Sequence, residues 1–103
     1  MVVERWVAKP GKEEEHMQIM QKFRKYVKDN PEMFKEVKSL REYTQMLGGV
    51  SGMFIWLIEY DSLAHYEKLA SRMEKDKEAA KLTQEWTALI DRPTWSIEIW
   101  HTM

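Results

Sequence analysis

Cysteine is absent from this chain of 103 residues. Disulfide bonds, thiolate catalysis and sulfur-ligated zinc sites are therefore excluded, and the composition is typical of a reducing compartment. No stretch approaches the roughly 18 consecutive apolar residues of a transmembrane helix, and the opening MVVERWVAKPGK lacks the layout of a signal peptide. We therefore expect a cytoplasmic protein without a membrane partner.

An excess of charge of one sign is also missing. The chain has 16 Lys and Arg residues against 17 Asp and Glu residues, which gives a net charge of −1. Such a balance provides no general attraction to nucleic acid, so we expect no nucleic-acid partner. No linker or low-complexity stretch divides the sequence, and we expect residues 1–103 to form a single domain.

Tryptophan and methionine are abundant instead, with five and eight residues. Five tryptophans in so short a chain indicate either an aromatic-rich core or an aromatic-lined pocket. The methionines have helical spacing and are most simply core residues.

The hydrophobic pattern predicts an α+β fold. Alternating or β-branched segments predict strands at 2–8, 39–47, 53–60 and 94–102, and helical spacing predicts helices at 13–30 and 62–90, the second with a break near 75–76. Residues 32–38 fit either a helical turn or an irregular link, and Gly48, Gly49 and Gly52 indicate a turn. The order β-α-β-β-α-β is that of a ferredoxin-like sheet with both helices on one face.

The strand at 53–60 is apolar on both sides. One alternating set is Met53, Ile55 and Leu57, and the other is Phe54, Trp56, Ile58 and Tyr60. Two helices cover only one face, and an exposed apolar face is liable to aggregate. We therefore expect a homodimer in which sheet faces sheet about a two-fold axis, with the first set under the helices and the second facing the partner. The alternative is a monomer in which residues 29–38 fold over the sheet.

Two segments resemble known families. ERWVAKPGKEEEHMQIM resembles the strand, Pro-Gly and helix start of the antibiotic-biosynthesis-monooxygenase-like and NIPSNAP-like families, and IEYDSLAHYEKLASRMEKD resembles their second signature, a strand ending in an aromatic before a capped helix. Both families belong to the dimeric α+β barrel superfamily. The resemblance spans nearly the whole chain and implies two sheets that close into a barrel, with a pocket inside each half.

The resemblance also allows a comparison with the superfamily's haem-degrading members. Their site is formed by an asparagine on the first strand, a tryptophan that ends the third strand and a histidine on the following helix. The matching positions here are Glu4, Tyr60 and the region of Ala79-Ala80, where nothing can ligate iron. We therefore expect no haem. The cofactor-free quinone-forming monooxygenases rely on similar asparagine and tryptophan positions, so that analogy is weakened too.

A pocket facing the partner would place two carboxylates among aromatic rings. A carboxylate in such a cavity has its pKa raised by desolvation and can act as a general base. The predicted catalytic residues are Glu4 and Glu98, with His65 near the cavity mouth as a third candidate, and the predicted ligand-binding residues are Trp6, Phe54, Trp56, Tyr60 and Trp100. This arrangement turns Arg5 towards the helices, so either Arg5 reaches an edge or the first strand is flipped. Either carboxylate could instead pair with an arginine or face a solvated edge.

Function remains divided between two classes. The three histidines form no metal motif, so we expect no metal and no tightly bound cofactor. The first hypothesis is a protein that binds or converts a small aromatic or apolar molecule, as a cofactor-independent monooxygenase or an isomerase-like enzyme would. The second is a non-catalytic oligomerisation or binding module whose sheet serves assembly alone.

Overall fold

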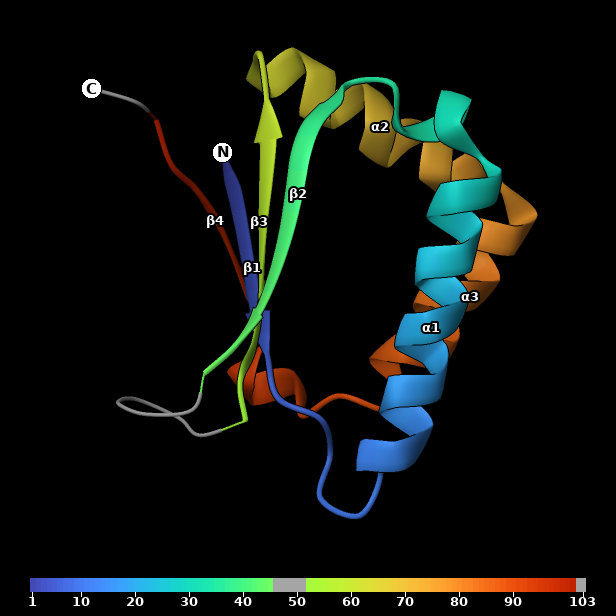
Figure 1. Cartoon of the computed structure of the whole chain (residues 1–103), viewed down its shortest axis with the longest axis vertical. Helices are drawn as coiled ribbons and strands as arrows, with labels where there is room; N and C mark the ends of the chain where they lie inside the picture. The colour runs from blue at the N-terminus through green and yellow to red at the C-terminus, as the bar shows by residue number, and fades with distance from the viewer. Residues whose placement is uncertain (46–51, 102–103) are drawn as a thin grey trace.

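A computed structural model describes residues 1–45 and 52–101. Four strands form one antiparallel sheet in the order β2-β3-β1-β4, and the helices pack on one face of it (Figure 1). The elements are β1 (Val2–Trp6), α1 (Glu13–Asp29), β2 (Val37–Thr44), β3 (Phe54–Tyr60), α2 (Leu63–Lys75), α3 (Lys77–Thr87) and β4 (Ser96–Ile99). The predicted ferredoxin-like α+β fold is confirmed. Most of the predicted turn at 48–52 lies outside the described residues.

Helix α1 begins after a turn at Gly11, whose φ of +83° favours glycine. Glutamates fill its first turn, where the positive end of the helix dipole favours anions. The helix ends at Asn30 before Pro31, and Pro31–Phe34 form a short 3-10 helix, η1. The first half of the 32–38 segment is thus a helical turn, and β2 begins at Val37.

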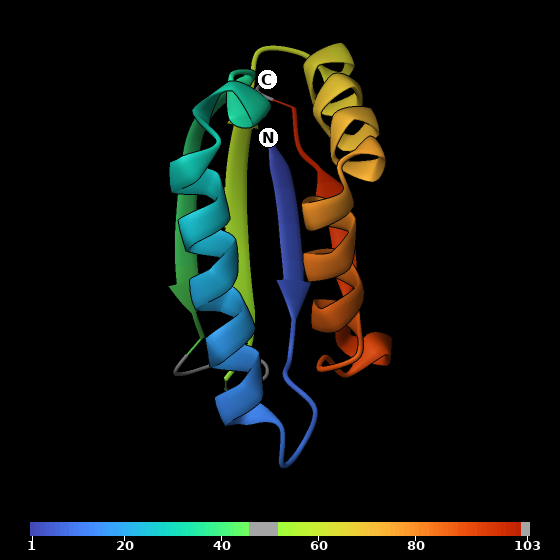
Figure 2. The same cartoon turned by 90° about the vertical axis from the view of Figure 1, so that its right-hand side faces the viewer.

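The predicted break near Lys75-Asp76 separates two helices. Asp76 has extended backbone angles, ends α2 and caps α3 by accepting a hydrogen bond from the Ala79 amide at 2.9 Å. The Ser62 hydroxyl caps α2 by accepting from the His65 amide at 3.3 Å. Figure 2 shows the result: α1 lies over β2 and β3, α3 lies over β4, and β1 is visible between them.

The core lies between sheet and helices and is centred on Trp6. The Trp6 ring centroid lies 5.1 Å from that of Trp86 and 5.2 Å from that of Trp56, both nearly perpendicular to it. Trp6 Nε1 donates a hydrogen bond to Nε2 of the fully buried His16 at 2.8 Å. The abundant tryptophans therefore serve mainly as core.

The prediction of which side of β3 faces the helices is wrong. Trp6 pairs with Phe54, and Phe54 and Trp56 pack against the helical core, so the set Phe54, Trp56, Ile58 and Tyr60 faces the helices. Ile55 and Leu57 face the open side, in the same rows as Arg5 and Arg41. Strand pattern alone could not choose between two apolar sets. The larger aromatic side chains fill the space under the helices, and the rows that hold Arg5, Arg41 and Glu98 stay on the open face.

The covering segment that the monomer alternative requires, residues 29–38, does not lie over the open face, because its residues 30–36 lie on the helix side. The guanidinium of Arg72 on α2 donates to the Met33 carbonyl at 2.7 Å and to both carboxylate oxygens of Glu36 at 2.7 Å. These bonds hold the pKa of Glu36 down at about 2. The segment is thus tied to α2, and within the described residues it cannot cover the open face of the sheet.

Candidate functional site

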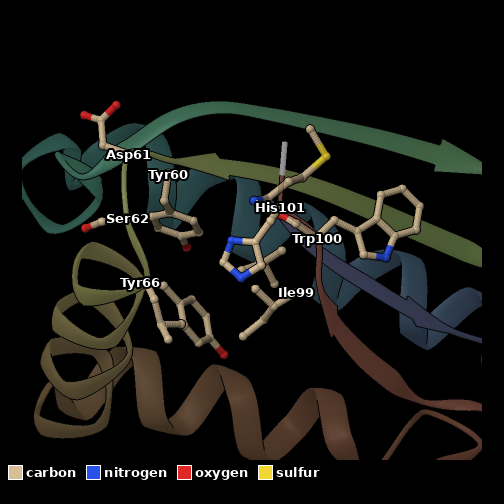
Figure 3. Close-up of a pocket in the computed structure, with 10 residues that line it drawn as sticks. Tyr60, Asp61, Ser62, Tyr66, Ile99, Trp100 and His101 are labelled. Atoms are coloured by element: carbon tan, nitrogen blue, oxygen red, sulfur yellow. Dashed lines mark hydrogen bonds between the residues drawn. The ribbon is translucent and has the colours of Figure 1, made fainter. Parts of the chain in front are cut away.

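A cleft opens at one end of the molecule, where β1 and α2 begin and β3 and β4 end (Figure 3). Its volume is ≈ 240 Å³. We call it the α2 cleft. The residues that line it are Met1, Val2, Tyr60, Asp61, Ser62, Leu63, Tyr66, Ile99, Trp100 and His101. It lies between the sheet and the helices, and is therefore distinct from the inter-sheet pocket expected from the sequence.

Two tyrosines form a corner of this cleft. The ring centroids of Tyr60 on β3 and Tyr66 on α2 lie 5.6 Å apart with an interplanar angle of 72° (Figure 3). Burial raises the pKa of both phenols, and the charge of Glu4 raises each further. Both side chains therefore remain neutral hydrogen-bonding groups at neutral pH.

Glu4 lies on the same, helix-facing side of the sheet but is not one of the residues that line the cleft. It follows Val2 by two residues on β1 and is paired across the sheet with Trp56 and Ile97. Trp95 Nε1 donates a hydrogen bond to Glu4 Oε2 at 2.7 Å. Burial nevertheless raises the pKa of Glu4, because desolvation outweighs this hydrogen bond. No donor among the described residues contacts Glu4 Oε1.

The chain is similar in fold to proteins of known structure. No family model and no curated protein sequence matches the chain. An uncharacterised NIPSNAP domain protein from Burkholderia xenovorans matches with a TM-score of 0.62 and 17% identity, over 98% of this chain and 95% of that one. This chain has a NIPSNAP-like, ferredoxin-like fold. Protein Atu4242 from Agrobacterium tumefaciens matches it with a TM-score of 0.70 and 12% identity, over 99% of this chain and 91% of that one. Identities this low show a shared fold and no shared activity.

The NIPSNAP-like sheet brings five of the predicted site residues to one face. Glu4, Trp6, Phe54, Trp56 and Tyr60 all point towards the helices. Trp6 is fully buried in the core, and Phe54 and Trp56 pack against it. Of these five residues, Tyr60 lines the cleft, and Glu4 follows the lining residue Val2 by two positions along β1 without lining the cleft itself.

The predicted pairing of Glu4 with Glu98 in one cavity is wrong. Because Ile97 is the partner of Glu4 across β1 and β4, Glu98 points to the opposite, open face. There its Oε2 lies 3.5 Å from Arg5 Nη2 and accepts from Trp100 Nε1 at 3.2 Å. Trp100 borders the cleft mouth, but its indole stacks with the Arg5 guanidinium at 5.9 Å. Arg5 thus faces the open side, which resolves the conflict noted in the sequence.

His65 lies in the first turn of α2, between two residues that line the cleft, but its own side chain does not line it. Its Nδ1 is buried and has no hydrogen-bond partner. No three His, Asp or Glu side chains lie close enough to hold a metal ion within 1–45 and 52–101. No helix in that part of the chain could cross a membrane.

Sequence reasoning missed Tyr66 and Trp95 as site residues. Tyr66 sits at helical spacing with core residues, and Trp95 falls on the alternation that faces the helices, so both are most simply assigned to the core. The place of Trp95 beside Glu4 follows from the pairing of β1 with β4, since the Trp95–Glu4 bond spans 91 positions, and that of Tyr66 follows from the packing of α2 on the sheet. Such non-local register has no local signal in the sequence.

Proposed function

We propose that this chain is a homodimeric protein that binds one small aromatic or apolar molecule in the α2 cleft, with a polar group of the ligand against Glu4. The observation that supports this most is a partly buried carboxylate of raised pKa, Glu4, whose charge acts on the two tyrosines that line a cleft open to solvent, although Glu4 is not itself a lining residue. A perturbed ionisable group in a concave, aromatic-lined site is a recognised mark of function.

The size and lining of the cleft limit the ligand. Its ≈ 240 Å³ is below the roughly 300–1,000 Å³ of pockets for drug-sized molecules, so the ligand has about the size of one substituted ring. Apolar side chains stay exposed beside Glu4 and the cleft, with 46% of Leu63, 47% of Ile97 and 44% of Ile99 accessible. A bound apolar ligand would remove this area from water, which favours binding.

Glu4 supplies the chemistry in this proposal. A carboxylate whose pKa is raised can accept a proton from a ligand as a general base, with Tyr60 and Tyr66 as neutral hydrogen-bonding groups. The enzymatic form of the proposal is a cofactor-independent monooxygenase or isomerase-like reaction that begins with this proton transfer. Glu98 lies outside the cleft and is paired, and His65 has no contact with it, so neither has a role here.

The homodimer is proposed from the open face of the sheet. Ile55 and Leu57 lie on this face, and 47% of Tyr43 and 47% of Trp100 are exposed. Both signs of charge occur among these apolar residues, as Arg5 and Glu98 show, so the face can be complementary to a copy of itself. A purely oligomeric module without a ligand is the second candidate, and the same face favours it. A cytoplasmic location also remains a prediction.

Glutamine substitution separates these candidates. Glu4→Gln removes the negative charge of the carboxylate beside the cleft, and we expect it to weaken the binding of single-ring compounds such as phenol and benzyl alcohol by at least about tenfold, measured by ligand-observed NMR. Glu98→Gln is the matched control, because Glu98 also accepts from an indole but lies on the open face. Binding that is absent in the wild type, or equally reduced in both variants, would leave only the oligomeric module.

A further inference from the structure

A second cavity lies at the other end of β3, where this strand begins and β2 ends. Its volume is ≈ 190 Å³, and it shares no lining residue with the α2 cleft. Its lining residues come from α1, β2 and β3, which lie together on the left of Figure 2. We call it the α1 pocket. The proposed function makes no use of it.

The floor of the α1 pocket is apolar and is fixed by the core. Trp56 meets the rings of Trp6 and Phe23 nearly edge-on, at centroid distances of 5.2 and 6.4 Å. Phe54 stacks with Trp6 at 5.9 Å, and Met20, which lines the pocket with these two rings, is 1% exposed. The floor is therefore in place before any ligand binds, which lowers the ordering cost of binding.

Met17 on α1 forms an adaptable wall. It lines the pocket with 39% of its surface exposed, although it is a large apolar residue. A thioether side chain is flexible and makes favourable contacts with aromatic rings. The volume is below the roughly 300–1,000 Å³ of pockets for drug-sized molecules, so the pocket admits about one ring. Such a ring would remove apolar area of Met17 and of the floor from water.

An ion pair forms the rim between α1 and β2. Glu42 belongs to the helix-facing row of β2, since it pairs with Trp56, and its Oε2 accepts from Arg24 Nε at 3.1 Å and from Arg24 Nη2 at 2.8 Å. The two charges neutralise one another. Arg24 Nη1 and Glu42 Oε1 have no hydrogen-bond partner within residues 1–45 and 52–101. The rim thus offers one donor and one acceptor on two groups in contact.

We propose that the α1 pocket binds a small neutral aromatic amide, whose ring lies against Phe54 and Trp56 and whose amide group bonds to Arg24 and Glu42. An amide carries a carbonyl acceptor beside N–H donors, so it can accept from Nη1 and donate to Oε1 while the ion pair stays intact. A carboxylate competes with Glu42 for Arg24, and an ammonium group competes with Arg24 for Glu42. The inference concerns a second site and does not depend on the proposed function.

NMR of a protein labelled at its methionine methyl carbons tests this inference, because Met17 and Met20 line the α1 pocket and Met1 lines the α2 cleft. Benzamide, benzoate and benzylamine share a ring and are neutral, negative and positive at neutral pH. We expect benzamide to shift the Met17 and Met20 signals of the wild type in a saturable way. It should bind there at least about tenfold more tightly than benzoate or benzylamine.

One substitution at the rim tests the recognition of the amide. Arg24→Met removes the donor but keeps a long side chain, and we expect it to weaken benzamide binding by at least about tenfold. Lys25→Met is the matched control, because Lys25 is an exposed cation at the next position of α1 and does not line the pocket. Exposed ion pairs contribute little to stability, so both variants should fold, which far-ultraviolet circular dichroism checks.

The remaining outcomes overturn the inference. Met17 and Met20 signals that do not respond to benzamide would show that the α1 pocket does not bind it, and a response of Met1 alone would place the ligand in the α2 cleft. Equal binding of the three ligands at Met17 and Met20 would contradict the amide assignment. Benzamide binding as tight in Arg24→Met as in the wild type would show that the ion pair does not recognise the amide.

Discussion

His16 shows at the residue scale how a buried polar group is specified. Its Nε2 accepts from Trp6, so its Nδ1 carries the proton, and that atom is buried without a partner. Its ring also lies 4.6 Å from that of Phe54. Burial lowers the pKa of His16 because an imidazolium ion would be poorly solvated there. The histidine is therefore held neutral in the folded protein.

This arrangement predicts a loss of stability in mild acid. The unfolded chain protonates His16 near its ordinary pKa of about 6.5, while the folded chain resists protonation. Unfolding then takes up a proton, and the free energy of unfolding falls as the pH drops below about 6.5, by at most about 1.4 kcal/mol per pH unit from this group. Urea unfolding of the wild type and of His16→Gln at about pH 7.5 and about pH 5.5 measures this fall in the free energy of unfolding.

The variant should lose this pH dependence, since glutamine can accept the Trp6 bond but does not titrate. The raised pKa of Glu4 acts in the opposite direction, because the folded state binds that proton more tightly. Glu4 is present in both proteins, so its contribution cancels when the pH-dependent change in the free energy of unfolding of the wild type is compared with that of His16→Gln. Equal changes in the two proteins would contradict the account of His16.

At the scale of elements, one aspartate divides a continuous helical pattern into α2 and α3. Asp76 ends the first helix and caps the second through its bond to the Ala79 amide. We expect Asp76→Ala to reduce the free energy of unfolding by about 1 kcal/mol, measured by urea denaturation. Asp76→Asn is the control, because an asparagine side chain accepts the same bond. A loss as large in Asp76→Asn would mean that the cap is not the cause.

The elements also show what could be predicted from the sequence. Caps and breakers such as Asn30-Pro31 and Asp76 act locally, so the helix ends were recognisable from neighbouring residues. The faces of β3 were not, because Phe54, Trp56 and Ile58 are as apolar a set as Met53, Ile55 and Leu57. The choice depends on volume under the helices, which only the assembled layers define. The same holds for the site. Glu4 and Tyr60 were predicted as site residues, but the sequence did not predict that they lie on the side of the sheet that faces the helices.

At the scale of the whole molecule, the open sheet face predicts concentration-dependent association. Leu57 lies in a central strand on this face, between Val3 and Arg41 in register. Leu57→Asp would place a desolvated charge in the proposed interface, and we expect it to convert the proposed dimer to a 12.4 kDa monomer in sedimentation velocity. Leu40→Asp is the control, because Leu40 is 40% exposed and belongs to the helix-facing row of an edge strand. A wild-type monomer at tens of micromolar would contradict the dimer.

The central claim is the proposal that a ligand of the α2 cleft reaches Glu4 beside it, and carboxyl-carbon NMR of a glutamate-labelled protein tests it most directly. In the free protein the Glu4 signal should titrate above the ordinary pKa of 4.5. On addition of phenol or benzyl alcohol it should shift in a saturable way, while the Glu98 signal on the opposite face stays in place. A Glu4 signal that titrates normally and does not respond to any ligand would contradict the account.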